Sequence, residues 1–216
     1  MWVIEVPEVQ SDARIPVEKM RMARALEIPV FNLMKQEMGK LGKPRKVIKE
    51  GETWRVEWKT SHNWSLEYAT RPQTSLTGNR LPDFQIKKDG RAVLAIECKN
   101  WAKTSRWSTL TVKRDILERF CWLPPMCRRI LMASHLNAKT DNETVQIRGL
   151  MDKHEIMVRL LKDVVGSPEL SGKRVYKKLW PIVHEELGFI RKARGRKKGN
   201  QKGQIKIEVY TPKKGQ

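Results

Sequence analysis

Apolar residues recur at helical spacing near the start of the chain. They predict one helix over residues 17–26 and a second helical stretch that Pro29 begins and that Gly39 and Gly42 close. The apolar positions that define these two helices are Val17, Met20, Leu26, Phe31, Met34, Met38 and Leu41. The pattern therefore predicts two successive helices that each present one apolar face to a core.

Further along the chain the period changes from helical spacing to alternation. Trp54, Val56 and Trp58 alternate with charged residues, which predicts a half-buried strand, and residues 64–68 favour another. Residues 43–51 are basic and read as a loop. Residues 83–87 and 92–99 are expected to form two strands of a hairpin, because the Asp-Gly dipeptide at 89–90 is a strong turn signal.

The remaining chain adds helices and strands to this hairpin. The pattern predicts a helix over 109–120, a buried strand over 129–134 and a long amphipathic helix over 141–165, which Asp141 caps and Gly166 stops. It also predicts a helix over 173–187 that Pro181 bends or splits, and a short strand over 205–210. This order indicates an α/β or α+β core with a small mixed sheet.

The net charge of the chain indicates which class of partner it binds. Lys and Arg number 44 against 24 Asp and Glu, so the formal net charge is +20. Such a body repels itself, and a polyanion relieves the repulsion, with nucleic acid as the usual one. A membrane is not expected as partner, because no apolar run approaches the roughly 18 residues of a spanning helix and residues 1–16 do not resemble a signal peptide.

The numbers and spacing of cysteine and histidine argue against a disulfide framework and against a zinc site. Cys98, Cys121 and Cys127 are too few and too odd in number for a disulfide framework, which indicates a reducing, intracellular setting and predicts cytoplasmic localisation. The four histidines lie far apart and no CxxC pair is present, so the spacing of a zinc site is absent from the sequence.

Residues 81–101, LPDFQIKKDGRAVLAIECKNW, contain the candidate chemistry. Strand alternation places Val93, Ala95, Glu97 and Lys99 on one face, with Leu94, Ile96 and Cys98 on the other. A carboxylate and an ammonium at the end of an apolar strand cost desolvation energy, which a bound metal and a phosphate would compensate.

The hairpin register decides whether Asp83 joins Glu97. A two-residue loop would place Asp83 opposite Ile96, on the wrong face. Asp83 lies across from Glu97 only if the loop has three residues, 89–91, with Gly90 at positive φ, or if one strand contains a bulge. We therefore predict an odd-length loop or a bulge in this hairpin.

Two carboxylates at a strand end form a hard oxygen site that suits Mg²⁺ or Mn²⁺. Such an ion polarises a phosphoryl oxygen and generates hydroxide from bound water. Lys99 would orient that water or stabilise the developing charge, and the backbone carbonyl of Cys98 is a candidate further ligand.

Pro82 and Asp83, followed by Glu97, Cys98 and Lys99, resemble the motif of the PD-(D/E)xK nuclease superfamily, which includes restriction endonucleases and Holliday junction resolvases. The continuation into Asn100 and Trp101 resembles Mrr-like branches, and the similarity spans about residues 29–165. The resemblance implies a restriction-endonuclease-like α/β core and a Mg²⁺-dependent endonuclease that cuts DNA, with Asp83, Glu97 and Lys99 as catalytic residues. It also implies a possible homodimer.

The resemblance points to additional site residues. The family often adds an acid from its first helix, for which Glu37 is our candidate, with Glu18, Glu27 and Glu67 as competitors. A basic residue on the second helix often faces the site, which indicates Lys113 or Arg114. Tryptophans in the loop after the catalytic strand are candidates for base contact, and the basic run 191–202 for phosphate contact. These candidates are Trp101, Trp107, Arg191, Arg194, Arg196, Lys197 and Lys198.

The expected organisation is an N-terminal lead at 1–28, a nuclease core at 29–167 and a basic C-terminal extension at 168–216. Two other functions stay open at this point: a protein of the same fold that binds DNA or a branched junction without cutting it, and a basic RNA-binding protein in which the motif is incidental.

Overall fold

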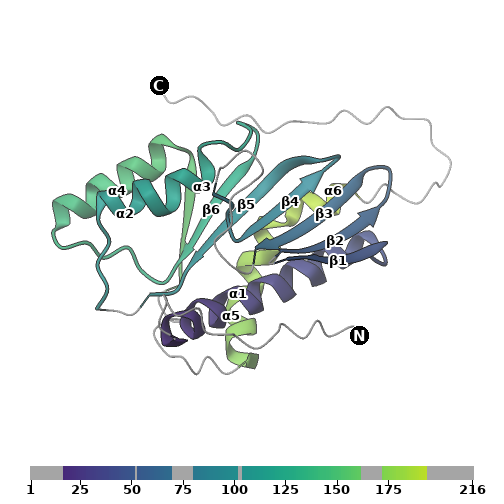
Figure 1. Cartoon of the computed structure of the whole chain (residues 1–216), viewed down its shortest axis with the longest axis horizontal. Helices are drawn as coiled ribbons and strands as arrows, with labels where there is room; N and C mark the ends of the chain where they lie inside the picture. The colour runs from purple at the N-terminus through teal and green to yellow at the C-terminus, as the bar shows by residue number, and fades with distance from the viewer. Residues whose placement is uncertain (1–16, 52, 70–79, 102–103, 162–171, 194–216) are drawn as a thin grey trace.

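The computed structural model describes residues 17–51, 53–69, 80–101, 104–161 and 172–193. These residues form an α/β fold with a seven-stranded mixed sheet flanked by helices (Figure 1). The strands follow chain order, and they are antiparallel from β1 to β5 and parallel from β5 to β7. Their bounds are β1 Lys46–Glu50, β2 Thr53–Lys59, β3 Asn63–Ala69, β4 Phe84–Lys88, β5 Arg91–Lys99, β6 Arg128–Ala133 and β7 Ile156–Leu160.

Helices cover the two faces of the sheet unequally. On one face lie α1 (Val17–Met38), α5 (Gly172–Glu186) and α6 (Gly188–Ala193), which bury a core cluster that includes Phe31, Leu66 and Leu179. On the other face, α2 (Thr109–Val112), the π-helical turn Lys113–Leu117, α3 (Glu118–Phe120) and α4 (Asp141–Lys153) pack a second cluster against β5, β6 and β7. Figure 1 shows α2, α3 and α4 gathered over β5 and β6, away from β1, β2 and β3.

Several predicted elements are confirmed. The strands predicted over 54–58, 64–68 and 129–134 are β2, β3 and β6, and the helix predicted over 173–187 is α5, which continues through an exposed Pro181. Residues of α5 and α6 bury apolar side chains in the same core as α1. The described part of the C-terminal extension, residues 172–193, therefore contributes to the core. The strand predicted over 205–210 lies outside the described residues.

The prediction of two N-terminal helices is wrong, because α1 runs unbroken through Pro29. Proline removes one backbone hydrogen bond from a helix interior. Leu26, Val30, Phe31 and Met34 continue one buried face on both sides of it, and their burial outweighs that cost. Phe31 packs on Tyr68 and Phe84, with ring centroids 5.0 and 6.3 Å away.

The loop expected over 43–51 instead contains β1, the edge strand. Four of its five residues are exposed, and it includes Lys46 and Lys49, so it lacks the apolar alternation that marks a strand in sequence. Backbone pairing with β2 forms this strand, and charged side chains are typical of a protected sheet edge.

The long helix predicted over 141–165 is also wrong. Helix α4 ends at Lys153, Glu155 adopts a left-handed φ of 54°, and β7 then runs parallel to β6. The apolar residues from Ile156 onward fit a short buried strand as well as a helix, an ambiguity that periodicity alone does not resolve. Thr140 caps α4, accepting a hydrogen bond from the Glu143 N–H at 3.1 Å, where Asp141 was expected to cap it.

Two further observations concern the helices and the cysteines of the described residues. In the described part of the chain, no helix combines the length and apolarity that crossing a bilayer requires. Cys98, Cys121 and Cys127 are free thiols, in agreement with the expectation of no disulfide framework.

Candidate functional site

The β4–β5 hairpin sets the register of the candidate site. Asp89 and Gly90 form a two-residue turn with φ of 50° and 80°, so the expected three-residue loop is wrong. The register then shifts, because Lys87 pairs with Ala92 but Ile86 pairs with Leu94. Val93 is thus an extra residue on β5, and the predicted bulge is confirmed.

The bulge brings the two acids together on one face. Phe84 pairs with Ile96, so the next position places Asp83 beside Glu97. Val93 packs with Leu94 against the α1 core cluster, whereas Ala95 belongs to the cluster on the opposite face. The expectation that Val93 shares a face with Ala95 is therefore wrong, and the change of face at the bulge aligns Glu97 with Asp83.

Glu97 is in direct contact with both Asp83 and Lys99. The backbone N–H of Asp83 donates to Glu97 Oε2 at 3.1 Å, and the backbone N–H of Cys98 donates to Asp83 Oδ2 at 2.7 Å. Lys99 Nζ forms an ion pair with Glu97 Oε1. Glu97 is fully buried, and the Lys99 side chain is 16% exposed. The structure thus brings the three predicted residues to one point at the end of β4 and β5.

Arg119 is a further member of the site that sequence reasoning missed. Its Nε lies 3.2 Å from Glu97 Oε1 and donates to the Asp115 carbonyl at 2.9 Å, while another guanidinium nitrogen donates to the Leu81 carbonyl at 2.7 Å. Arg119 therefore joins the segment before Asp83 to Glu97 and to the second helix.

A sequence signal for Arg119 does exist. It lies three residues after Ile116 and beside Phe120, so it falls within the apolar stripe of its helix, where an unpaired cation is unexpected. The helix widens here in a π turn, in which the Glu118 N–H donates to the Lys113 carbonyl five residues back. Such π turns are frequent at functional sites.

The acid that α1 contributes is Glu27, one of the competitors of Glu37. Glu27 Oε2 accepts a hydrogen bond from the Tyr68 hydroxyl at 2.9 Å, and its charge acts on Asp83 and Glu97. Burial is the main reason that the Glu27 pKa is raised, against the opposing effect of the Tyr68 hydrogen bond. We call Glu27, Asp83 and Glu97 the carboxylate cluster.

Glu37 lies in a different environment, at the contact between α1 and α5. It pairs with Lys40, and His184 Nδ1 lies 3.1 Å from its Oε1. Burial alone would raise its pKa, but the hydrogen bonds from Lys40 and His184 lower it. The structure thus assigns Glu37 to an ion-pair group at a helix contact, separate from the carboxylate cluster.

Burial, followed by the repulsion between neighbouring carboxylates, sets the electrostatics of the cluster. Burial, and then repulsion from Glu97 and Glu27, raises the pKa of Asp83 well above its usual value. For Lys99, burial opposes the charged form, but the attraction of Glu97 and Asp83 prevails and raises the pKa of the ammonium. Lys99 and Arg119 oppose the rise in the pKa of Asp83 but do not cancel it.

These residues fit a divalent cation in part. Within the described ranges, no three carboxylate, imidazole or thiol groups are already gathered as a complete ligand set, and Glu97 Oε1 is occupied by Lys99 and Arg119. Asp83 Oδ1 accepts no hydrogen bond from the described residues, and Glu97 Oε2 accepts one. Mg²⁺ commonly binds through one or two carboxylates and keeps several waters, so Asp83 and Glu97 suffice to anchor it.

The other sequence candidates occupy varied positions. Trp107 is 1% exposed and its ring lies 4.3 Å from that of Trp101, so Trp107 is a core residue whose ring is inaccessible to a base. Lys113 and Arg114 are exposed on the second helix, and Arg114 pairs with Asp115. Cys98 contacts the cluster through its N–H, and its carbonyl stays a predicted ligand. Arg191 lies in α6, and Arg194, Arg196, Lys197 and Lys198 fall outside the described residues.

Comparison with known proteins returns no match, whether against family models, curated proteins or solved structures. The function of this chain therefore has to be argued from the chemistry of the carboxylate cluster and its cationic neighbours.

The raised pKa of Asp83 has a consequence for stability. A carboxyl group with a raised folded-state pKa stabilises the fold below its unfolded pKa of about 4, and this contribution is lost as pH rises through the folded value. Without divalent cations, we expect the melting temperature to fall as the pH rises above about 4, and to fall less in Asp83→Asn.

The same melting experiment with Mg²⁺ supplies the complementary measurement. At about pH 8, Mg²⁺ is expected to raise the melting temperature of the wild type, because a cation bound only by the folded protein stabilises it, and to leave Asp83→Asn almost unchanged. The two proteins differ only at Asp83, so the difference between their pH profiles isolates the contribution of that residue. Identical pH profiles for the two proteins would contradict the assignment of Asp83.

Proposed function

We propose that the protein is a metal-dependent endonuclease that hydrolyses phosphodiester bonds in DNA. The observation that supports this most directly is the convergence of Asp83, Glu97 and Lys99 at the end of the β4–β5 hairpin. This arrangement combines oxygen ligands for a hard cation with a fixed ammonium, the groups that phosphodiester hydrolysis needs. The formal charge of +20 favours a polyanionic substrate.

In this proposal Asp83 and Glu97 hold Mg²⁺ or Mn²⁺, and Glu27 is close enough to influence it through its charge. The bound ion would supply Lewis acidity and a nucleophilic hydroxide at neutral pH. Asp83 is held by the Cys98 N–H and Glu97 by Lys99 and Arg119, so both carboxylates are fixed before the substrate arrives. Preorganised ligands of this kind avoid reorganisation during the reaction.

The role of Lys99 follows from its charge. Because its neighbours raise its pKa, Lys99 is an ammonium at neutral pH and does not serve as a general base. It instead orients the attacking water or stabilises the negative charge that develops on the phosphoryl oxygens. Arg119 is more enclosed, with a side chain 8% exposed, and it acts as a positioning residue for Glu97.

The proposal predicts Mg²⁺-dependent nicking of supercoiled plasmid by the wild-type chain, seen on a gel as conversion to open circles. EDTA is expected to abolish the reaction and Mn²⁺ to restore it, because both Mg²⁺ and Mn²⁺ suit a carboxylate site. A matched digestion of structured RNA and of branched and single-stranded DNA identifies the substrate form.

Two outcomes would replace this proposal. Tight binding to DNA with no cutting in either metal would favour a DNA- or junction-binding protein of the same fold. Stronger binding to RNA than to every DNA form, without metal dependence, would favour an RNA-binding protein. If the protein cuts both strands of a duplex in one encounter, the proposal includes a homodimer. Sedimentation of the DNA-bound protein would test for this homodimer.

A further inference from the structure

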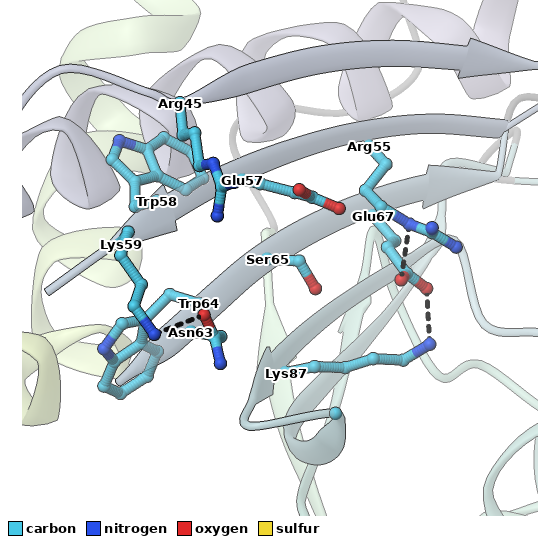
Figure 2. Close-up of a pocket in the computed structure, with 11 residues that line it drawn as sticks. Arg45, Arg55, Glu57, Trp58, Lys59, Asn63, Trp64, Ser65, Glu67 and Lys87 are labelled. Atoms are coloured by element: carbon cyan, nitrogen blue, oxygen red, sulfur yellow. Dashed lines mark hydrogen bonds and ion pairs between the residues drawn. The ribbon is translucent and has the colours of Figure 1, made fainter. Parts of the chain in front are cut away.

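Among the described residues, no helix covers the face of β1–β4 that adjoins the carboxylate cluster. Strands β1–β4 bury one face under α1 and α5, and their opposite face, which we call the open face, consists of polar side chains. The open face is hollowed, with a volume of about 380 Å³ (Figure 2). Charged side chains line this hollow: Arg45, Arg55, Lys59 and Lys87, together with Glu57 and Glu67.

Cations outnumber acids around the hollow, four to two. Figure 2 shows Glu67 held between Arg55 and Lys87, with N–O distances of 3.1 and 2.7 Å. Arg55 also pairs with Glu50 at 3.8 Å, so Arg55 and Lys87 are both engaged with carboxylates, while Arg45 and Lys59 are exposed at the rim. Lys46, which pairs with Glu57 in the sheet register, adds another exposed cation at the edge. The surplus positive charge favours an anionic ligand.

The hollow and the carboxylate cluster share one face of the sheet. Asp83, Gln85 and Lys87 are alternate positions at the start of and along β4, so their side chains leave the strand on the same side. Glu67 pairs with buried Gln85, which continues the polar stripe between hollow and cluster. Four residues of strand span about 13 Å, and the duplex rises 3.4 Å per base pair, so the hollow lies about four base pairs from the cluster.

The lining favours phosphates over bases as the contacted groups. Trp58 and Trp64 are 2% and 3% exposed, so they present no free ring for stacking on an unpaired base. The accessible groups are guanidinium and ammonium ions, which bind the sugar–phosphate backbone without reading sequence. A duplex, whose bases are already stacked, satisfies such a surface better than an unpaired strand.

We propose that the hollow on the open face binds the phosphate backbone of a DNA duplex, about four base pairs from the phosphate that faces Asp83 and Glu97. The placement relative to the cut phosphate rests on the proposed function, whereas binding at the hollow is tested without cleavage. The site is sequence-independent, and the duplex axis runs along β4, the direction in which this separation is measured.

The test is the salt dependence of DNA binding, measured by fluorescence anisotropy with a labelled duplex in EDTA so that no strand is cut. The logarithm of the binding constant falls with the logarithm of salt concentration by about 0.9 for each phosphate neutralised. The double variant Arg45→Gln/Lys59→Gln should therefore lower this slope by about 1.8. Between 50 and 200 mM salt it should lose roughly tenfold less affinity than the wild type.

The matched control is Arg148→Gln/Lys153→Gln, which removes the same charge from exposed positions of α4, on the covered half of the sheet. An equal fall in slope for both variants, or none for Arg45→Gln/Lys59→Gln, would overturn the proposal. An effect seen on duplex RNA but not on duplex DNA would also overturn it.

Plasmid nicking by the wild type, run in parallel, separates the two proposals. A chain that binds DNA through the hollow but never nicks would lose its nuclease assignment and keep its binding surface. A chain that nicks normally with an unchanged salt slope in Arg45→Gln/Lys59→Gln would keep its activity and lose the hollow as a DNA site.

Discussion

Replacing Lys99 with alanine is expected to lower the rate of Mg²⁺-dependent plasmid nicking by about 10² to 10³-fold. The physical reason is that Lys99 supplies a fixed positive charge beside Glu97, at the place where negative charge develops on the phosphoryl oxygens. Arg119 still pairs with Glu97 in the variant, so no carboxylate is left buried without a cation. The fold and DNA affinity should therefore be kept, as circular dichroism and anisotropy would show.

The control for this experiment is Lys153→Ala, which removes an exposed lysine from α4. Its nicking rate should match the wild type. A second variant, Lys99→Gln, retains a hydrogen-bond donor without the charge, and it separates orientation of the water from stabilisation of charge. Undiminished nicking by Lys99→Ala would remove Lys99 from the mechanism and weaken the nuclease proposal as a whole.

The second large effect is expected in stability. Phe31→Ala should lower the free energy of unfolding by about 3 to 5 kcal/mol, measured by urea denaturation followed by circular dichroism. Phe31 is 1% exposed and packs against Tyr68 and Phe84, whose own ring centroids lie 4.8 Å apart. Because a domain is stable by only about 5 to 15 kcal/mol, this loss is a large fraction of the total.

The aromatic group also supports the candidate site directly. Tyr68 donates to Glu27, and Phe84 follows Asp83, so a cavity at Phe31 would loosen two members of the carboxylate cluster. Leu110→Ala is the control, since Leu110 is 67% exposed and its truncation should change stability by about 0.5 kcal/mol or less. A loss below about 1 kcal/mol for Phe31→Ala would contradict the packing described for this core.

Sequence patterns predicted the parts of the fold in which local preference and burial agree. Strands β2 and β3 and helix α5 follow from apolar periodicity, because each buries one regular face. Strand β6 follows from a short apolar run that is buried on both faces of the sheet. The patterns failed where the tertiary structure overrides local preference. Pro29 is tolerated because α1 is buried on both sides of it, and β1 forms by backbone pairing despite exposed, charged side chains.

At the candidate site, the motif identified Asp83, Glu97 and Lys99, and the structure brings them into contact. For the acid from the first helix, sequence analysis favoured Glu37 over Glu27. Both lie on α1, and only the approach of Tyr68 and β5 distinguishes Glu27. Arg119 was missed because its partners, Glu97 and the Leu81 carbonyl, are distant in sequence. Side chains that meet through tertiary packing leave no short motif.

The single extra residue at Val93 decides on which face of the hairpin Glu97 lies relative to Asp83. Between Asp83 and Glu97 the chain must contain one irregularity, since a perfectly regular ribbon closed by the same two-residue turn would send one carboxylate into the α1 core. Related chains with a longer or shorter hairpin could therefore keep the pair only by changing length in steps of two, or by moving the irregularity elsewhere. The number of residues between Asp83 and Glu97 can therefore change only in steps of two, because side chains alternate between the two faces of a strand.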